Sequence, residues 1–145
     1  MRRFGEAIVR GQTYRKRPGA YAILERDGQI LLTHQQAPVP EYQLPGGGID
    51  PGEGALQALH REAFEETGWS IANPRRLGAY RRFVWMPEYE FWAEKICSIF
   101  VARPILQHSA PREMGHTAVW VTPEEALDLL ANQGDRHFLA RWLGH

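Results

Sequence analysis

The amino-acid sequence predicts an α/β fold in which a mixed β-sheet packs between helices. Two strand-like runs flank Asp27-Gly28, a dipeptide that favours a tight hairpin turn. Residues 55–67 show the apolar spacing of an amphipathic helix. Further strand-like runs and a second helix start follow this segment. This order of strands and helices is typical of a sheet covered by helices.

Length and charge narrow the classes of function. The 145 residues suit one domain over 1–145. Acidic and basic side chains number 17 each, so the formal net charge is zero. This balance disfavours nucleic acid or an anionic membrane as partner. An anionic ligand would have to be bound by a local arrangement of residues, since the protein has no overall positive charge. Because we find neither the apolar core of a signal peptide nor a membrane-spanning run, we expect a cytoplasmic protein without a membrane partner.

The first half of the chain contains a hairpin, a loop and a helix. Residues 20–25 and 29–33 are the expected strands of the hairpin, and residues 35–53, rich in proline and glycine, read as loop. The helix covers residues 55–67, with Gly54 as N-cap and Gly68 as the residue that ends it. On a helical wheel, the expected core face carries Leu56, Leu59 and Ala63, with Phe64 at its edge.

The second half contains strands and two helices. Residues 77–85 and 92–102 look like strands around a turn at Pro87, and residues 117–121 form a short strand. Cys97 lies in an apolar run, which favours a buried strand residue over a reactive thiol. Thr122 and Pro123 open a helix that runs to about residue 131. A last short helix is expected over 135–143.

Three carboxylates share one flank of the 55–67 helix. Glu62 and Glu66 stack at i,i+4, and Glu65 lies at i,i+3 from Glu62. Arg61 is the one cation in the helix that is close enough in sequence to offset their repulsion. Such a cluster is often only a solvated acidic face, but Mg²⁺ is a natural partner because it prefers oxygen ligands and shares its coordination sphere with phosphates.

The residues around this cluster match a known motif. The segment GGGIDPGEGALQALHREAFEETGW (46–69) resembles the Nudix box, and the following residues fit its fixed positions: Gly47, Glu53, Arg61, Glu62, Glu65, Glu66 and Gly68. The approach YQLPGGGIDPGE and the later VWVTPEEAL are also similar to that family. Ala63, Gly54 and Trp69 depart from the usual residue types, and none of these departures removes a carboxylate.

Resemblance to MutT-like Nudix hydrolases implies an α/β/α sandwich around a mixed sheet. It also implies Mg²⁺-dependent, or Mn²⁺-dependent, hydrolysis of a nucleoside diphosphate linked to another group. The implied metal ligands are Gly47 through its backbone, Glu53, Glu62, Glu65 and Glu66. Arg61 would orient a carboxylate of the box. Glu65 or Glu66 would serve as general base, with Glu113 as the rival.

Substrate contacts are expected from the backbone of Gly46 and Gly47, from Arg81 and from Trp85. Arg81 belongs to the second of two basic pairs, at residues 75–76 and 81–82, which could bind phosphates or simply be exposed at strand ends. Trp85 belongs to an aromatic cluster that could stack on a base, join the core or form a dimer contact. His116 is interpreted as structural, since the histidines show no metal-like spacing.

Three classes of function remain open at this point. The leading hypothesis is a pyrophosphohydrolase of (d)NTPs or oxidised (d)NTPs, with ADP-ribose or dinucleoside polyphosphates as the next substrates. The second is a non-catalytic nucleotide-binding module, and the third is an acidic surface for basic partners. The partner expected under the first two is a small nucleotide-like diphosphate, and a homodimer is compatible with the resemblance. Metal-dependent release of phosphate or of a nucleoside monophosphate separates the first class from the others.

Overall fold

The computed structural model describes all residues from Met1 to His145. It confirms the α/β class with a mixed sheet and three helices. The elements follow one another as β1 (Arg2–Arg3), β2 (Arg15–Arg26), β3 (Gln29–Gln35), β4 (Glu41–Gln43), β5 (Gly46–Gly48), α1 (Ala55–Thr67), β6 (Trp69–Met86), β7 (Phe91–Gln107), β8 (His116–Val121), α2 (Pro123–Leu129) and α3 (Gln133–Trp142). None of the helices combines the length and the apolar character that a membrane crossing requires.

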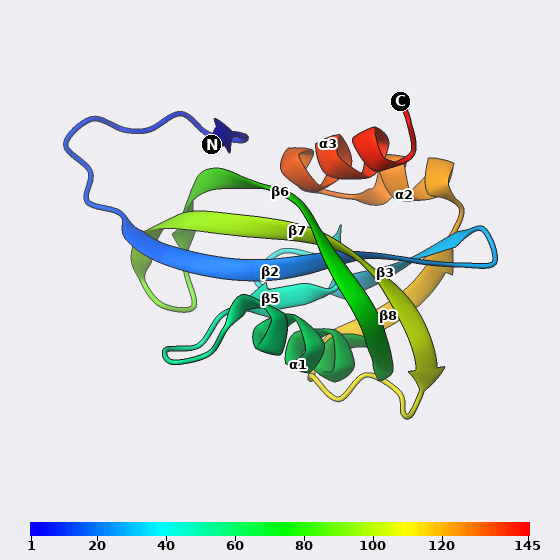
Figure 1. Ribbon diagram of the computed structural model, residues 1–145. Coiled ribbons are helices and arrows are strands. Elements are labelled where there is room, and N and C mark those ends of the chain that lie inside the picture. The colour runs from blue at the N-terminus through cyan, green and yellow to red at the C-terminus, as the bar shows by residue number, and fades with distance from the viewer.

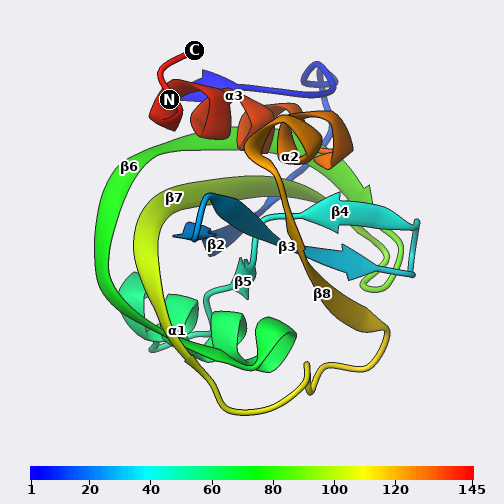
Figure 2. The ribbon, with the colours of Figure 1, turned by 90° about the vertical axis from the view of Figure 1, so that its right-hand side faces the viewer.

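The strands form one strongly curved sheet with helices on both sides. The strand order is β1-β6-β7-β2-β3-β4, with β5 added to β2 and β8 added to β3. The pairings of β2 with β7 and of β1 with β6 are parallel, and the others between named strands are antiparallel. Helix α1 covers one side, and α2 and α3 cover the other side together with both chain termini (Figure 1). The view along the sheet shows β6 and β7 curving around one side, with β3, β4 and β8 on the other (Figure 2).

Two apolar clusters fill the space between the sheet and the helices. On the α1 side, Leu59 and Ala63 pack with Leu24, Leu31 and Phe100. On the opposite side, the core includes Ile23, Tyr80, Ile99, Phe138 and Leu139. Because successive strand residues point to opposite faces, the central strands β2 and β7 contribute to both clusters. Cys97 is buried in the second cluster, as predicted.

Local signals explain the ends of the helices. Gly54 is the N-cap of α1, and Gly68 ends the helix in the left-handed conformation with a φ of 78°. An added Cβ on Gly68 would come within 1.8 Å of the Ser109 carbonyl oxygen, so both the backbone angle and the space require glycine. Thr122 and Glu125 form a reciprocal capping box at the start of α2.

Several details differ from the expectations. The 35–53 segment contains the short strands β4 and β5, and β6 and β7 extend well beyond 77–85 and 92–102. Leu56, expected in the core, is 47% exposed, whereas Leu59 and Ala63 of the same expected face are fully buried. Glu66 itself is only 5% exposed. The buried arc of the helix therefore includes one of its carboxylates.

Candidate metal centre and substrate cleft

The site is built where α1 lies against the glycine strand β5. β5 pairs with β2, which holds Gly46 and Gly47 beside α1. A Cβ on Gly47 would lie 2.5 Å from the carboxyl carbon of Glu62, so any other residue here would displace the Glu62 carboxylate from its position. The backbone N–H of Gly46 donates to Oε1 of Glu66 at 3.0 Å. The two glycines thus fix two carboxylates of the helix.

Arg61 organises the outer side of the cluster. Its Nε and Nη2 each lie 2.8 Å from a different carboxylate oxygen of Glu53. Its Nη1 donates to Glu62 at 2.8 Å and to Glu65 at 3.4 Å, and its Nη2 donates to the carbonyl oxygen of Gly48. The hydrogen bonds from Arg61, together with the Asp50 backbone N–H, lower the pKa of Glu53 to about 2. The Glu53 carboxylate raises the pKa of Arg61 in turn.

The structure therefore places Glu53 apart from the other predicted ligands. The structure contains two groups of potential metal ligands, and within each group the ligand atoms lie within 4.8 Å of one another. One group is Glu62, Glu65 and Glu113, and the other is Glu66, Glu113 and His116. Glu53 belongs to neither, because both of its oxygens face the guanidinium of Arg61. Glu113 belongs to both.

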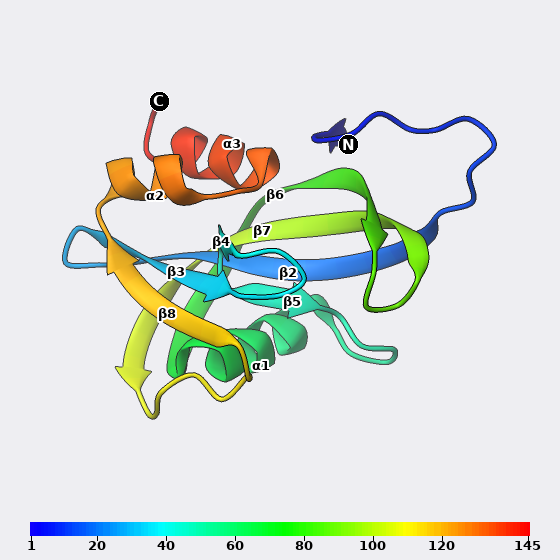
Figure 3. The ribbon, with the colours of Figure 1, turned by 180° about the vertical axis from the view of Figure 1, so that it is seen from behind.

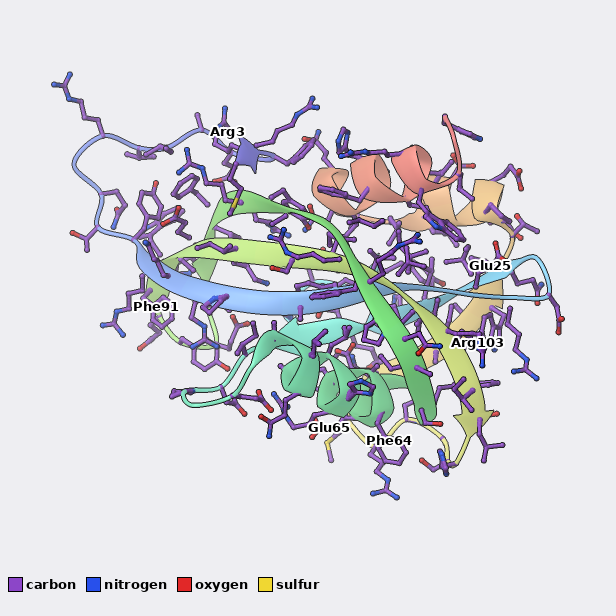
Figure 4. The ribbon with its side chains drawn as sticks, viewed as in Figure 1. Arg3, Glu25, Phe64, Glu65, Phe91 and Arg103 are labelled. Atoms are coloured by element: carbon purple, nitrogen blue, oxygen red, sulfur yellow. The ribbon has the colours of Figure 1, made fainter.

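Glu113 reaches the cluster because its loop is bound to the end of α1. The backbone N–H groups of Arg112 and Glu113 donate to the carbonyl oxygen of Glu65 at 2.8 and 3.1 Å. The guanidinium of Arg112 lies over the ring of Phe64, 5.0 Å from its centroid. Phe64 and Glu65 lie on the side of α1 that this loop passes (Figure 4). Glu113 has no arginine or lysine within ion-pair distance.

His116, interpreted from the sequence as a structural residue, lies next to the carboxylate cluster. Its Nδ1 is 3.4 Å from Oε2 of Glu66, and its Nε2 is 3.8 Å from Oε1 of Glu113. Nδ1 is buried and makes no hydrogen bond. His116 is the first residue of β8, three residues after Glu113. That spacing was the only sequence signal for its proximity to the cluster.

Burial dominates the electrostatics of the inner carboxylates. Burial raises the pKa of Glu66 well above its usual value, against the lowering effect of the Gly46 N–H, and neighbouring carboxylates raise it further. Burial also raises the pKa of Glu62, although Arg61 opposes this shift. A divalent cation would relieve both effects by favouring the ionised carboxylates. The all-carboxylate group of Glu62, Glu65 and Glu113 is a donor set that fits Mg²⁺ or Mn²⁺.

These carboxylates line a cleft of about 340 Å³. Glu62, Glu66, Glu113 and His116 line it together with Gly46 and Gly47, while Trp85 and Tyr89 come from the β6–β7 hairpin. Figure 3 shows this hairpin and the strands β3, β4 and β8 from the side opposite to that of Figure 1. The cleft therefore has an acidic part and an aromatic part.

The predicted substrate contacts are only partly brought together. Gly46, Gly47 and Trp85 line the cleft, but Arg81 does not. Its Nη1 lies 3.5 Å from Oε2 of Glu94 on the neighbouring strand. Since successive strand residues alternate in direction, it is Arg82 that faces the cleft. The structure thus places the neighbouring residue Arg82, and not Arg81, in the lining of the cleft.

A curved mixed sheet with a carboxylate-bearing helix held against a glycine strand is the arrangement of Nudix-type α/β/α sandwiches. The NUDIX domain family matches residues 13–142, and the chain belongs to this family. A solved NUDIX hydrolase from Nitrosomonas europaea shares the fold with a TM-score of 0.74 and 19% identity over 90% of each chain. The solution structure of the E. coli ORF135 protein has a TM-score of 0.65 and 28% identity, covering 90% of this chain and 91% of that one.

Curated relatives match a shorter segment. A Bacillus subtilis (strain 168) protein named "Putative 8-oxo-dGTP diphosphatase" is 42% identical over 64 residues, which are 44% of this chain and 43% of that protein. An RNA pyrophosphohydrolase from Serratia proteamaculans (strain 568) is 42% identical over 62 residues, which are 43% of this chain and 35% of that protein. The matches thus span less than half the length of these relatives.

Proposed function

We propose that the chain is a pyrophosphohydrolase that depends on Mg²⁺ or Mn²⁺ and cleaves the diphosphate linkage of a nucleoside diphosphate derivative. The observation that carries this proposal is that Glu62, Glu66 and Glu113 line one part of a cleft, with Glu65 grouped beside Glu62 and Glu113. The names of the relatives, a diphosphatase and an RNA pyrophosphohydrolase, support the same reaction class. (d)NTPs, including oxidised ones, are the leading substrates.

The inner carboxylates hold the metal in this proposal. Glu62, Glu65 and Glu66 supply carboxylate oxygens, and the backbone of Gly47 packs closely against Glu62. A divalent ion bound there would neutralise phosphate oxygens and lower the pKa of the attacking water. Arg61 acts as a positioning residue through Glu62 and Glu65, and Glu53 acts through Arg61.

Glu113 is the proposed general base. It accepts the proton of the water as the water oxygen bonds to phosphorus and the bridging P–O bond breaks, with the electron pair leaving on the released phosphate. Glu65 is the alternative base, but it already accepts a hydrogen bond from Arg61, whereas Glu113 is free of such a partner. Both side chains are 43% exposed, so water reaches either.

The test is a panel of diphosphate substrates with Mg²⁺ or Mn²⁺, read as released phosphate after phosphatase coupling. The panel contains (d)NTPs, 8-oxo-dGTP, ADP-ribose and dinucleoside polyphosphates. We expect metal-dependent turnover of at least one class by the wild type and its loss in Glu66→Gln. Binding of nucleotides without turnover of any of them would instead indicate the non-catalytic module, and the proposal would then be abandoned.

A further inference from the structure

Three cations stand side by side on the face of the sheet that lines the cleft. Arg17 of β2 pairs with Lys95 of β7, and Lys95 pairs with Arg82 of β6. Paired residues of neighbouring strands project from the same face, and all three residues line the cleft. We refer to Arg17, Lys95 and Arg82 as the cation row.

The cation row has no ion partner within the protein. No carboxylate lies within 4.0 Å of any of the three side chains. The carboxylates that act on Lys95 from a greater distance are Asp135 and Glu88. Like charges directly opposite one another on neighbouring strands destabilise a sheet. The row therefore lowers the stability of the free protein and favours the binding of an anion.

The surroundings strengthen this attraction. Burial lowers the pKa of Lys95, and the adjacent Arg82 lowers it further, so an anion bound beside both cations would favour the charged form of Lys95. Arg82, directly opposite Lys95, adds a guanidinium to the same face of the sheet. An anion in the row would be screened from bulk water by the walls of the cleft, where charge interactions are stronger.

Arg17 connects the row to the acidic part of the cleft. Its guanidinium lies over the ring of Tyr89, 4.8 Å from the centroid, which holds it in place. Its Nη2 is 3.8 Å from the position of a Cβ on Gly48. Gly48 directly follows Gly47, the residue that packs on Glu62. One extended ligand can therefore contact the carboxylates and the cation row together.

We propose that the cation row binds a phosphoryl group of the substrate other than the two that flank the scissile bond. The preferred substrate then carries three or more phosphates, in contrast to an ADP-sugar whose second end is neutral. Guanidinium and ammonium groups together match the charge and the acceptor geometry of a phosphate. The inference rests on the proposed function for the position of the scissile diphosphate, but binding to the row does not require catalysis.

A metal-free binding experiment tests the row by itself. Thermal unfolding of the full chain is followed in EDTA with increasing inorganic tripolyphosphate. We expect a rise in Tm for the wild type and for Arg103→Gln, and little or none for Lys95→Met and Arg17→Gln. Arg103 is an exposed cation near the other end of β7, remote from the Phe91 end (Figure 4), and controls for nonspecific charge effects.

The same data separate a ligand role from a structural one. Without tripolyphosphate, Lys95→Met is expected to unfold at the same temperature as the wild type or higher, because the change removes a repelling charge from a half-buried position. If Lys95→Met does not fold, Arg17→Gln on the half-buried start of β2 decides the question. Equal Tm shifts in the wild type and in the row variants would overturn the proposal.

A kinetic comparison then links the row to the substrate. A nucleoside triphosphate and the diphosphate of the same nucleoside are compared with Mg²⁺. Lys95→Met is expected to lower kcat/KM for the triphosphate about 10-fold to 100-fold, the usual effect of losing a charged hydrogen bond, and to leave that for the diphosphate unchanged. Equal losses for both would overturn the row as a phosphate site and leave the proposed function intact. No turnover of any substrate by the wild type would overturn the proposed function, and the metal-free experiment would still decide the row.

Discussion

The guanidinium of Arg61 holds both oxygens of the Glu53 carboxylate, with two nitrogen–oxygen distances of 2.8 Å. This paired contact makes Glu53 the anchor of Arg61, and Arg61 in turn reaches Glu62 and Glu65. Planar two-point contacts of this kind are a property of arginine that lysine cannot reproduce. Glu53 therefore helps to order the carboxylates of Glu62 and Glu65 through Arg61, although it does not belong to their cluster.

The contact between Arg61 and Glu53 predicts a specific acid dependence. The pKa of Glu53 in the folded protein is lowered to about 2 from an ordinary value of 4.5, so its ionised form stabilises the fold above pH 4.5. This stabilisation is lost as the pH falls toward 2. In urea unfolding across this range, Glu53→Gln should be less stable than the wild type near neutral pH and equal to it near pH 2. A stability difference that does not change with pH would contradict this reading.

Substitution of the inner carboxylates should remove activity without unfolding the protein. We expect Glu62→Gln and Glu66→Gln to lower kcat by at least about 100-fold, since each removes a metal ligand in the proposed reaction. Because burial raises the pKa of both groups, the neutral amides should be tolerated in the fold. Asp128→Asn on the exposed side of α2 is the matched control. Full turnover by the Gln variants of Glu62, Glu65 and Glu66 would end the assignment.

Gly47 offers a separate steric test. Gly47→Ala places a methyl group 2.5 Å from the Glu62 carboxyl carbon, so the carboxylate has to move. We expect a loss of metal-dependent turnover together with a nearly unchanged circular dichroism spectrum. Gly54→Ala is the control, because a Cβ there meets nothing within 4 Å and the backbone is extended. Similar activity of the two variants would argue against a close approach at Gly47.

Metal binding should stabilise the protein more strongly as the pH rises. The pKa values of Glu62 and Glu66 are raised, so protons favour the metal-free protein and compete with Mg²⁺ until the pH exceeds these values. The rise in Tm on adding a fixed Mg²⁺ concentration should therefore grow from pH 5 to pH 8 in the wild type. In Glu66→Gln the rise should be much smaller at every pH. Chelation with EDTA should reverse it.

The buried pair of Tyr80 and Asp135 predicts a stability effect far from the chemistry. The Tyr80 hydroxyl donates to Oδ1 of Asp135 at 2.7 Å, and both side chains are buried. Tyr80→Phe removes one hydrogen-bond donor from a buried carboxyl, which should lower the free energy of unfolding by about 1–3 kcal/mol. Tyr14→Phe, which removes an exposed hydroxyl contact, is the control. Turnover in the folded Tyr80→Phe protein should match the wild type.

Features fixed by short-range signals could be predicted from the sequence. The bounds of α1 agree with the expected 55–67, because Gly54 and Gly68 mark its ends. The hairpin at Asp27-Gly28 and the helix cap at Thr122 were also predicted correctly, because each depends on residues adjacent in the sequence. The strand β5 was missed, since three glycines carry no side-chain pattern and pair only because β2 is beside them.

Features that depend on register or distant packing could not be predicted. The sequence alone could not choose between Arg81 and Arg82, because β6 has irregularities in its pairing before Gly78 that shift which residues face the cleft. The nearness of Glu113 and His116 to Glu66 depends on a loop that follows a 17-residue strand. The exposure of Leu56, in the first turn of α1, depends on where along its length the helix contacts the sheet.

The carbonyl of Glu65 accepts hydrogen bonds from the N–H groups of Arg112 and Glu113, and this contact limits which insertions and deletions the chain can tolerate. A deletion or insertion between residues 108 and 115 would detach the acid from the helix even with every side chain conserved. The spacing of this connection is thus as constrained as the identity of the glutamates. Variation in length should be tolerated at the Asp27-Gly28 hairpin tip, and not here.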